Sequence, residues 1–597
     1  MEKILKKLGE PFGVLAESST YQLKVIALNA DVALGDLFIM PSQRGNIDRF
    51  YLFRTTEYAN VLNRSFELSE IARSKLTMPD SYFSEDLANE KLIELKGILL
   101  GYAEFFQGGW IFKKPRRLPE HFTNVYQVRN NDPDVAEVVK LLLQGQLGSN
   151  GLLVGKIMAG EGFLPQVDVF LPTVSLSHHI GIFGRTGAGK SNLMMVLLSS
   201  IMKHNEAVEA GMEQDRKASI FAIDPHDEFK AWHSASGGSE GIRGIVNGYS
   251  DNQQQNLISP FYYLTSKRLE KEGLERTIKF SRADLLPDDL YSIMEFTEQQ
   301  IAYLNRQFNL WGEEWVLRTL LGDTFDLENS EQGADFLPGT KSAVQRRMSF
   351  LSGSNSKIIT TFDEEAGNFY DSILIDLVCA LEKGRVIIVD TSLLNELEQF
   401  LLTTVLARTL FTLRKSLRSV EHVENLEEAI KTAFRVNETL GQTGLRTLAE
   451  GFVYSLREGS LPYIRNEKVV SPDDLPYINV VIEEAPSILN PQRLRFGSVF
   501  RDISRQGRKF GIGLTVISQQ VSEIDKGVLT QINTEFNMSL GNDEERREAV
   551  RNASGDLKGF EQELQVMGKG QVILTTVFKE IPIPIQVLPY DNIAFKE

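Results

Sequence analysis

The stretch "IGIFGRTGAGKSNLMMVL", Ile180–Leu197, constrains this chain most, because an apolar strand runs into a glycine-rich turn and then into an apolar helix. Within it, Gly184–Ser191 matches the pattern G-x-x-x-x-G-K-[ST] at every fixed position. Glycines let successive backbone N–H groups turn toward one phosphate without a side-chain clash. The following helix directs the positive end of its dipole at the same anion. The stretch therefore predicts a nucleotide site.

Two side chains of this motif have defined chemistry. Lys190 is expected to reach the β- and γ-phosphates, and the hydroxyl of Ser191 is expected to bind Mg²⁺. A chance match in a glycine-bearing loop is the alternative, which the flanking strand and helix disfavour. We expect ATP and Mg²⁺ as cofactors, with nucleotide held by Gly184, Arg185, Thr186, Gly187, Ala188, Gly189, Lys190, Ser191 and Asn192.

Hydrolysis also needs acids near the phosphates, and "INVVIEEAP", Ile478–Pro486, offers two at one strand end. Glu483 is expected to face Mg²⁺, and Glu484 to polarise the attacking water. The alternative is an ordinary acidic strand-to-helix boundary, in which a glutamate caps the next helix. Adjacent acids after an apolar run favour the catalytic interpretation.

Two other strand ends carry candidate catalytic groups. Asp224 ends "FAID", and ligands in parallel α/β folds bind at the carboxyl ends of strands. Gln519, after "LTVIS", could contact the γ-phosphate through its amide. Each has a plainer interpretation: Asp224 as part of an Asp-Pro turn, and Gln519 as a polar residue at a strand terminus.

Arginines precede the last of these strands in "RDISRQGRKFGIG", Arg501–Gly513. Most arginine-rich segments are solvated faces. Beside a phosphate-binding strand, however, Arg505 or Arg508 could stabilise transition-state charge, often in the site of a neighbouring subunit.

The chain is long enough for several domains, and its pattern changes near Leu153. Short strands before that point predict a small barrel or sandwich with some helix, such as Asp134–Leu143. Long β-branched strands alternating with helices after it predict a parallel α/β sheet. The expected strands are Gly13–Leu28, Ala33–Met40 and Arg49–Thr56 in the first part, then His179–Gly184, Ala218–Asp224, Gly384–Ser392, Ile478–Pro486 and Gly511–Gln520.

Helical insertions interrupt the second part. Pro287–Leu304 has a proline and acids at its start and apolar residues at helical spacing, which predicts a helical segment. Gln571–Tyr590 is typical of an edge strand leading into a proline-stiffened tail. The expected domains are a barrel domain 1–152, a core 153–265, a helical insertion 266–380, a second core half 381–575 with an insertion at about 420–471, and a tail 576–597.

Composition excludes some classes of protein. The net charge of −16 argues against a chain whose whole surface coats nucleic acid, although a narrow basic channel stays open. The single cysteine, Cys379, rules out a disulfide framework or a cysteine zinc site and fits a reducing cytoplasm. No signal peptide and no apolar run of about 18 residues is found, so no membrane partner is expected.

The motifs, taken in order, resemble the HerA/FtsK branch of P-loop ATPases, and HerA within it. They are "HHIGIFGRTGAGKSN", "IFAIDPHDEF", "KGRVIIVDTS", "VVIEEAP" and "RQGRKFGIGLTVISQQVSEID". The resemblance implies an α/β, RecA-like core behind a small β-barrel, and a homohexamer that hydrolyses ATP while translocating on double-stranded DNA. It also implies Glu484 as the catalytic carboxylate, Gln519 as a sensor and Arg508, then Arg505, as the arginine acting in trans.

This chain departs from that family at three positions. His178 stands where members often have an arginine, Pro486 replaces a histidine, and Asp227 replaces a glycine. HerA-like proteins work with a NurA-like nuclease or, in anti-phage systems, with a nuclease or sirtuin-type NADase. The insertions and acidic balance favour the defence type. The alternative function is a nucleotide-dependent ring that assembles an effector enzyme without moving on DNA.

Overall fold

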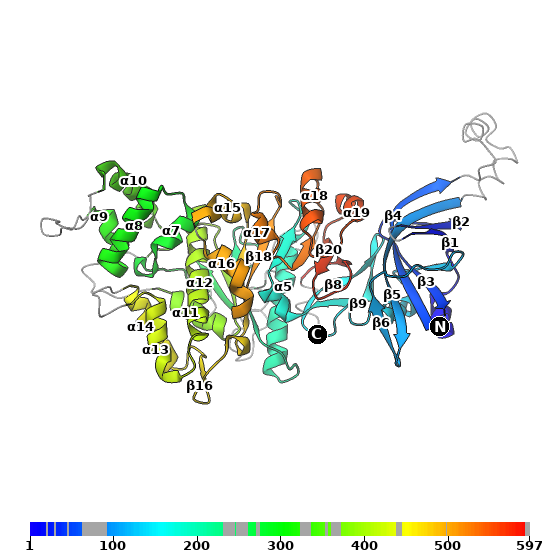
Figure 1. The fold of residues 1–597 in the computed structure, drawn as a ribbon, viewed down its shortest axis with the longest axis horizontal. Helices are drawn as coiled ribbons and strands as arrows, with labels where there is room; N and C mark the ends of the chain where they lie inside the picture. The colour runs from blue at the N-terminus through cyan, green and yellow to red at the C-terminus, as the bar shows by residue number, and fades with distance from the viewer. Residues whose placement is uncertain are drawn as a thin grey trace. The chain divides into compact units, whose positions relative to one another are not determined.

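The computed structural model describes residues 1–19, 22–28, 31–44, 47–61, 92–230, 245, 261–269, 275–322, 336–352, 356–359, 372–436, 444–496 and 498–590. The chain forms two compact units. The first unit contains Met1–Pro172, Ile182–Leu197 and Asn533–Asn592, and the second contains Thr173–Gly181 and Leu198–Ile532. Figure 1 follows the chain by colour from blue to red. The domain boundaries expected from the sequence stay a prediction.

The first unit begins with a closed barrel, which confirms the predicted small barrel. Its strands lie in the order β2-β1-β7-β3-β4-β5-β6, and an additional pairing of β2 with β5 closes the wall. Closure pairs the strand edges that an open sheet would leave free. The strands are β1 (Gly13–Ser18), β2 (Leu23–Leu28), β3 (Leu37–Arg44), β4 (Ile47–Val61), β5 (Leu92–Phe106), β6 (Gly109–Lys113) and β7 (Asn124–Gln127).

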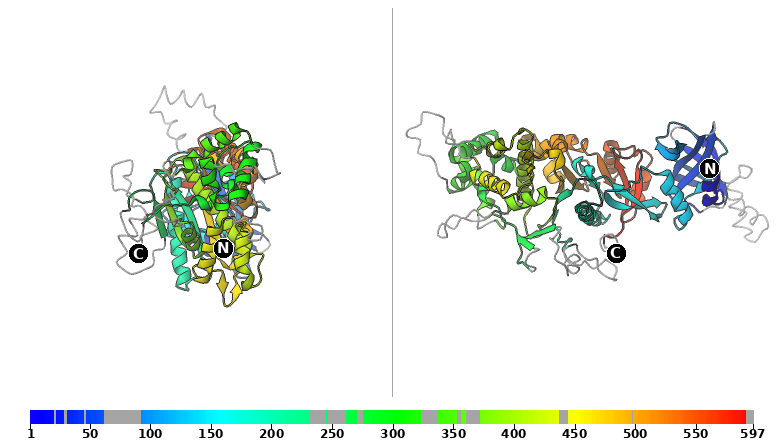
Figure 2. Two further views of the ribbon diagram at one scale, coloured as in Figure 1. Left: turned by 90° about the vertical axis from the view of Figure 1, so that its left-hand side faces the viewer. Right: turned by 90° about the horizontal axis from the view of Figure 1, so that it is seen from below.

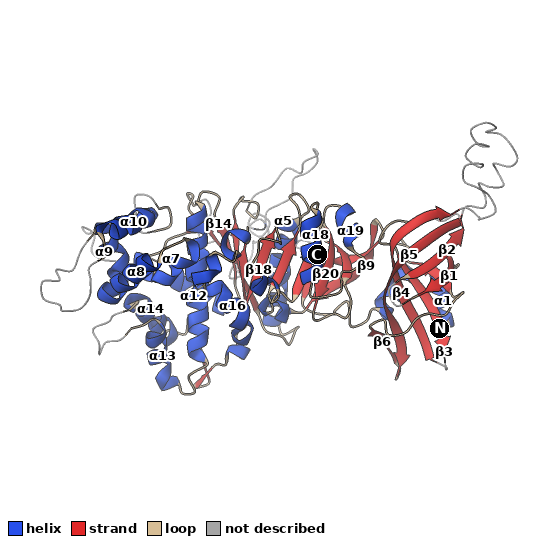
Figure 3. Ribbon diagram, turned by 45° about the horizontal axis from the view of Figure 1, so that its top comes forward, coloured by secondary structure: helices blue, strands red, loops and turns tan. Residues whose placement is uncertain are grey.

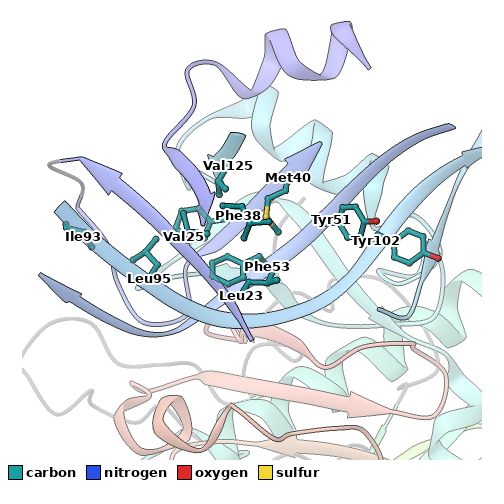
Figure 4. Packing of buried hydrophobic residues seen from close by; sticks show 11 residues of the cluster. Leu23, Val25, Phe38, Met40, Tyr51, Phe53, Ile93, Leu95, Tyr102 and Val125 are labelled. Atoms are coloured by element: carbon teal, nitrogen blue, oxygen red, sulfur yellow. The ribbon is translucent and has the colours of Figure 1, made fainter. Parts of the chain in front are cut away.

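Alternate side chains of these strands fill the barrel. Phe38 and Met40 on β3 and Tyr51 and Phe53 on β4 point to the same interior, as Figure 4 shows. This period of two is what a wall with one buried face requires. The other members of the core are Leu15, Leu23, Val25, Ile93, Leu95, Tyr102 and Val125.

Among the described residues, helices α1 (Glu2–Leu8) and α4 (Pro133–Leu142) accompany the barrel. The second confirms the helix expected near residue 134. Asp132 caps α4 by accepting from the amides of Asp134 and Val135, and Pro133 occupies the first turn, where its missing N–H costs nothing.

The rest of the first unit is a sheet with neighbours in the order β10-β19-β20-β21-β8-β9. Pairs β19–β20, β20–β21, β21–β8 and β8–β9 are antiparallel. The strands are β8 (Leu152–Ala159), β9 (Gly162–Leu171), β10 (Ile180–Phe183), β19 (Thr534–Asn537), β20 (Gln571–Thr576) and β21 (Ile583–Gln586); α18 (Asp543–Asn552) and α19 (Glu561–Val566) join β19 to β20.

The expected edge strand and tail at Gln571–Tyr590 is therefore wrong. The segment forms two paired strands, and each of them has a strand on both sides. Pro582 lies just before β21 and Pro584 lies within it, two residues further on. Because backbone N–H groups alternate between the two sides of a strand, both missing N–H groups fall on one side, and the amides of Ile583 and Ile585 point to the other.

The second unit contains the predicted parallel sheet, with neighbours in the order β13-β12-β14-β11-β17-β18. Its adjacent strands are parallel throughout. The strands are β11 (Ala218–Asp224), β12 (Phe261–Thr265), β13 (Glu275–Thr277), β14 (Val386–Asp390), β17 (Tyr477–Ile482) and β18 (Ile512–Ser518). Four of these lie where sequence placed them, and β12 and β13 are additions to the prediction. Figure 3 shows these strands in red.

The helices of the second unit pack mainly on one another (Figure 2). Among the described helices, none combines the length and apolar character needed to cross a bilayer. The longer ones are α7 (Pro287–Ile293), α8 (Glu298–Trp311), α9 (Trp315–Leu321), α10 (Pro338–Met348), α11 (Leu374–Glu382), α12 (Glu396–Leu417), α13 (Leu426–Ala433), α14 (Arg446–Arg457) and α16 (Val499–Gln506); α5 (Lys190–Glu209) begins in the first unit and ends in the second.

The helical segment expected over Pro287–Leu304 is confirmed, and it is divided between two helices, α7 and α8. Met294 is extended after α7. Thr297 then caps α8, since its hydroxyl accepts from the amide of Gln300 while the Gln300 side chain accepts from the amide of Thr297. This reciprocal cap starts a new helix.

A buried ion pair joins distant segments of the second unit. The Arg414 guanidinium on α12 donates to Glu382 on α11, with Nη2 2.7 Å from Oε2, and both side chains are fully buried. Tyr463 donates to the same carboxylate at 2.8 Å, and Arg414 also donates to the carbonyl of Phe510 at 2.9 Å. Because every partner is hydrogen-bonded, the buried charges are compensated.

Candidate nucleotide site

The phosphate-binding loop lies between the end of β10 at Phe183 and the start of α5 at Lys190. Gly187 and Gly189 have φ angles of +78° and +109°, a region that favours glycine. The carbonyl of Ala188 accepts from the amide of Gly570 at 2.9 Å, so the loop packs against the turn before β20. A Cβ on Gly189 would lie 3.3 Å from that amide nitrogen. The glycines expected from the motif are therefore required by the backbone.

The other side of the loop is held by the segment after β19. The amide of Arg185 donates to the carbonyl of Ser539 at 2.8 Å, and the amide of Met538 donates to Phe183 at 2.8 Å. With contacts on both sides, the loop is fixed before any ligand binds, which lowers the cost of binding a phosphate chain.

Lys190 folds back over this loop. Its Nζ donates to the carbonyls of Gly184 at 2.9 Å and Arg185 at 3.2 Å. The ammonium group and the N-terminus of the 20-residue helix α5 therefore lie at the same loop, and Ser191 lies in the first turn of that helix. Backbone amides, a helix N-terminus and a cation fit a triphosphate, and a hydroxyl oxygen fits Mg²⁺.

Asn192 was expected to help hold nucleotide, but in the structure its side chain bonds to backbone groups of the same unit. Its Nδ2 donates to the carbonyl of Leu588 at 3.0 Å, and its Oδ1 accepts from the amide of Tyr590 at 3.1 Å. The side chain ties the segment after β21 to α5. A role in nucleotide binding stays a prediction for this residue.

Glu484 occupies a strained turn in the second unit, directly after β17. Its φ is +47°, and such a backbone costs a non-glycine residue about 1–2 kcal/mol. The amide of Ala485 donates to Ile517 on β18 at 3.2 Å, and Pro486 starts the short helix α15 (Pro486–Leu489). The turn is thus held from both ends, with the Glu484 side chain exposed. Strain of this kind concentrates at functional sites.

Gln519 follows β18, the parallel neighbour of β17. Ile482 and Val516 are in register, so Glu483, Glu484 and Gln519 lie after the carboxyl ends of adjacent strands. Glu483 is half-buried and Gln519 is exposed. The structure thus brings these three predicted residues to one edge, where α/β sheets bind ligands.

Asp224 lies at this edge too, but its carboxylate is engaged locally. Oδ1 accepts from the amide of Glu228 at 2.9 Å and Oδ2 from the amide of Phe229 at 2.8 Å. Burial raises the pKa of Asp224 to about 6. These bonds favour the turn-forming alternative over catalysis, and the catalytic role of Asp224 stays a prediction.

Beside it, Asp227 anchors a cluster that sequence reasoning missed. Its carboxylate accepts from the hydroxyl of Tyr263 and from Lys267, each at 2.8 Å, and Lys267 also pairs with Asp390 at 2.9 Å. Asp390 ends β14, so the strand-end rule that found Asp224 could have found it. Lys267 follows a strand that was not predicted, and no sequence signal marked it.

Arg505 and Arg508 are both exposed, as residues acting in a neighbouring subunit must be. Arg505 is in the last turn of α16, and Arg508 is in the 3₁₀ turn Gly507–Phe510 that follows. Burial lowers the pKa of His178, and the positive charge of Arg508 lowers it further. His178 therefore lies close enough to Arg508 to feel its charge.

His179 has a structural role. Its Nδ1 accepts from the amide of Leu514 on β18 at 3.1 Å, and its φ is +58°. Burial lowers its pKa to about 4, so the ring is neutral near pH 7. Within the described residues, no group of three or more His, Cys, Asp or Glu side chains that could hold a metal ion is found.

Lys190 belongs to the first unit and Glu484 to the second. Their convergence on one triphosphate therefore stays a prediction, as do the roles of Glu483, Gln519, Arg505 and Arg508.

Comparison with known proteins supports the resemblance. Residues 152–410 match the family described as "Helicase HerA, central domain". The DNA double-strand break repair helicase HerA of Pyrococcus furiosus is 21% identical over 594 residues, covering 98% of this chain and 93% of the relative. A probable DNA double-strand break repair helicase HerA of Methanocaldococcus jannaschii is 22% identical, covering 75% of this chain and 78% of the relative.

Among solved structures, the bacterial conjugative coupling protein TrwB covers 75% of this chain and 92% of its own at 11% identity, with a TM-score of 0.41. The resemblance therefore depends on the matched central domain, on the Pyrococcus relative that aligns over almost the whole chain, and on the phosphate-binding loop. The chain is similar to HerA-type P-loop ATPases, through its central domain and, at 21% identity, over almost its whole length.

Proposed function

We propose that this chain is an ATP-dependent translocase or helicase on double-stranded DNA, working as a homohexameric ring in the cytoplasm. The observation that carries the proposal is the strained Glu484 turn beside Gln519, in a chain whose phosphate loop is held on both sides. Strain is retained where a side chain must be aimed, and the catalytic carboxylate of a P-loop ATPase must be aimed at water. The HerA relatives are described as DNA double-strand break repair helicases.

Each residue has a distinct task in this proposal. The loop amides and Lys190 bind the β- and γ-phosphates, while Ser191 and Glu483 hold Mg²⁺, which supplies charge neutralisation on the phosphate oxygens. Glu484 orients the attacking water. Gln519 contacts the γ-phosphate, and Arg508 of one subunit stabilises developing charge in the site of the next.

Hydrolysis with and without DNA tests the motor. We expect blunt duplex DNA to stimulate ATP turnover, and Lys190→Ala and Glu484→Gln to abolish it. Native mass spectrometry of the same preparation is expected to give a six-subunit ring. Absence of stimulation together with absence of duplex binding at low salt would contradict translocation.

Mixed rings test the trans arginine. A subunit with Arg508→Ala keeps its own loop, and one with Lys190→Ala keeps its arginine, so each variant alone is expected to be inactive. Mixing the two restores some complete interfaces and some turnover if Arg508 acts across the interface. No recovery on mixing, while Arg505→Ala does complement Lys190→Ala, would assign the role to Arg505.

We further propose that the ring serves a partner enzyme, either a NurA-like nuclease in DNA-end processing or a nuclease or sirtuin-type NADase in anti-phage defence. The support is the resemblance to HerA together with the helical segments of the second unit. Copurification with the product of an adjacent reading frame tests this. If Lys190→Ala leaves activation of that partner intact while ATP turnover is lost, the ring is a scaffold and not a motor.

A further inference from the structure

The β5–β6 hairpin of the barrel ends in exposed aromatic and apolar side chains. Phe105 is 45% exposed, Phe106 52% and Ile111 45%. All three lie at or next to the turn that joins the two strands (β5 and β6 in Figure 1). Apolar groups gathered at one exposed place indicate a binding surface.

The tip of this hairpin is a tight turn. Phe106 and Gly109 form the last strand pair, and the two residues between them, Gln107 and Gly108, have φ angles of +50° and +85°. Positive φ at both positions is typical of the tight type I′ turn. The Trp110 ring lies 5.3 Å from that of the buried Phe50, which fixes the hairpin to the barrel core.

Rings are presented on both faces of the ribbon. Phe105 lies opposite Trp110, with ring centroids 5.3 Å apart, whereas Phe106 points to the other face with Ile111. A groove in a protein partner would contact only one apolar face of the hairpin. The bases of an unpaired strand present flat surfaces in succession, so they can stack on rings on both faces of the hairpin.

A basic segment overlaps the end of β6 and continues past it. "FKKPRR", Phe112–Arg117, places four cations in a chain whose net charge is −16. Arg116 and Arg117 are exposed. Lys113 pairs with Glu104 at 2.7 Å and Lys114 with Glu580 at 3.4 Å, and both lysines remain solvent-accessible. Aromatic rings beside a run of cations are the combination that single-stranded nucleic acid requires.

We propose that the β5–β6 hairpin and Phe112–Arg117 bind single-stranded DNA. The rings of Phe105 and Phe106 stack on unpaired bases, and Arg116 and Arg117 contact the phosphates. Duplex DNA keeps its bases stacked on one another and offers these rings no free face. The inference goes beyond the proposed motor, because the hairpin contains none of the groups assigned to ATP hydrolysis.

Cross-linking tests it on the full chain. A fluorescent 30-nucleotide oligo-dT carrying 5-iodouracil is irradiated with the Lys190→Ala chain, so that no turnover is needed. We expect the cross-linked peptide to contain residues 105–117. Anisotropy at low salt is expected to show about tenfold weaker binding for Phe106→Ala. Arg116→Gln/Arg117→Gln is expected to reduce the slope of log K against log salt by about 1.4.

Matched controls lie elsewhere on the same unit. Phe122→Ala removes a ring that is 80% exposed, and Lys140→Gln/Lys558→Gln removes two exposed cations. Both are expected to leave oligo-dT binding unchanged, and thermal melting verifies that all variants are folded.

Three results would overturn the inference: cross-links that map only outside residues 105–117, equal weakening of duplex and single-strand binding, or hairpin-dependent binding to anionic vesicles without oligo-dT binding. If the chain with Lys190 intact shows no stimulation of hydrolysis by DNA but the cross-link to residues 105–117 is still found, the proposed motor is contradicted and the proposed single-strand site is not.

Discussion

Replacing Glu484 by glycine is expected to stabilise the second unit while abolishing hydrolysis. The φ of +47° costs a glutamate about 1–2 kcal/mol, which glycine does not incur. Glycine in turn loses about 0.5–1 kcal/mol more conformational entropy on folding. The net expectation is about 0.5–1 kcal/mol of added stability, or a rise of about 1–2 °C in the unfolding midpoint of a unit this large.

Glu484→Gln is the matched control, because it removes the charge but keeps the strained backbone. Its midpoint is expected to equal that of the parent, since an exposed substitution changes stability by less than about 0.5 kcal/mol. Both variants are expected to lose at least about 100-fold in turnover. Calorimetry and a phosphate-release assay measure the two effects. A glycine variant that melts at or below the glutamine variant would refute the strain argument.

Three further predictions concern buried groups. Arg414→Ala leaves Glu382 charged and unpaired, so it is expected to lower the free energy of unfolding by about 3–5 kcal/mol, measured by denaturant titration; a loss below about 1 kcal/mol would contradict the buried pair. Burial raises the pKa of Glu535 on β19 to about 8, so the folded state holds that proton more tightly. The stability of the first unit is therefore expected to fall as the pH rises from the ordinary glutamate range through 8, and Glu535→Gln to flatten this dependence in melts from pH 5 to 9. If the melting temperatures of parent and variant change equally with pH, the proposed role of Glu535 is contradicted. Asn192→Ala removes two hydrogen bonds to backbone groups and is expected to cost about 1–3 kcal/mol of stability with little change in nucleotide affinity, measured by titration with ADP; a large loss of affinity without a loss of stability would restore its predicted binding role.

Much of the fold was predictable because its strongest signals are local. β11, β14, β17 and β18 are buried runs rich in β-branched residues. Three of them lie within their predicted ranges, and β17 begins one residue before its range. The motif that ends in Ser191 and the pair of acids after β17 are patterns of neighbouring residues. The sequence alone therefore also indicated which groups follow the ends of the strands. The break between α7 and α8 was visible too, since Thr297 and Gln300 have the spacing of a capping box.

Other features depend on contacts between residues far apart in the chain. The pairing of β21 with β8 joins segments more than four hundred residues apart, and no local pattern marks it. Lys267 reaches Asp227 and Asp390 only because β11, β12 and β14 are neighbours in the sheet. The strain at Glu484 is likewise invisible in a sequence, because a glutamate gives no sign of a left-handed backbone.

The buried hydrogen bond from Tyr463 to Glu382, the carboxylate that pairs with Arg414, has a consequence for exchanging segments of this chain. Tyr463 lies in the late helical insertion, whereas the carboxylate and the guanidinium belong to α11 and α12. A chimaera whose replacement insertion has no tyrosine at this position would leave the buried pair without its phenol donor. An exchange of this insertion therefore has to keep the phenol or replace all three residues together.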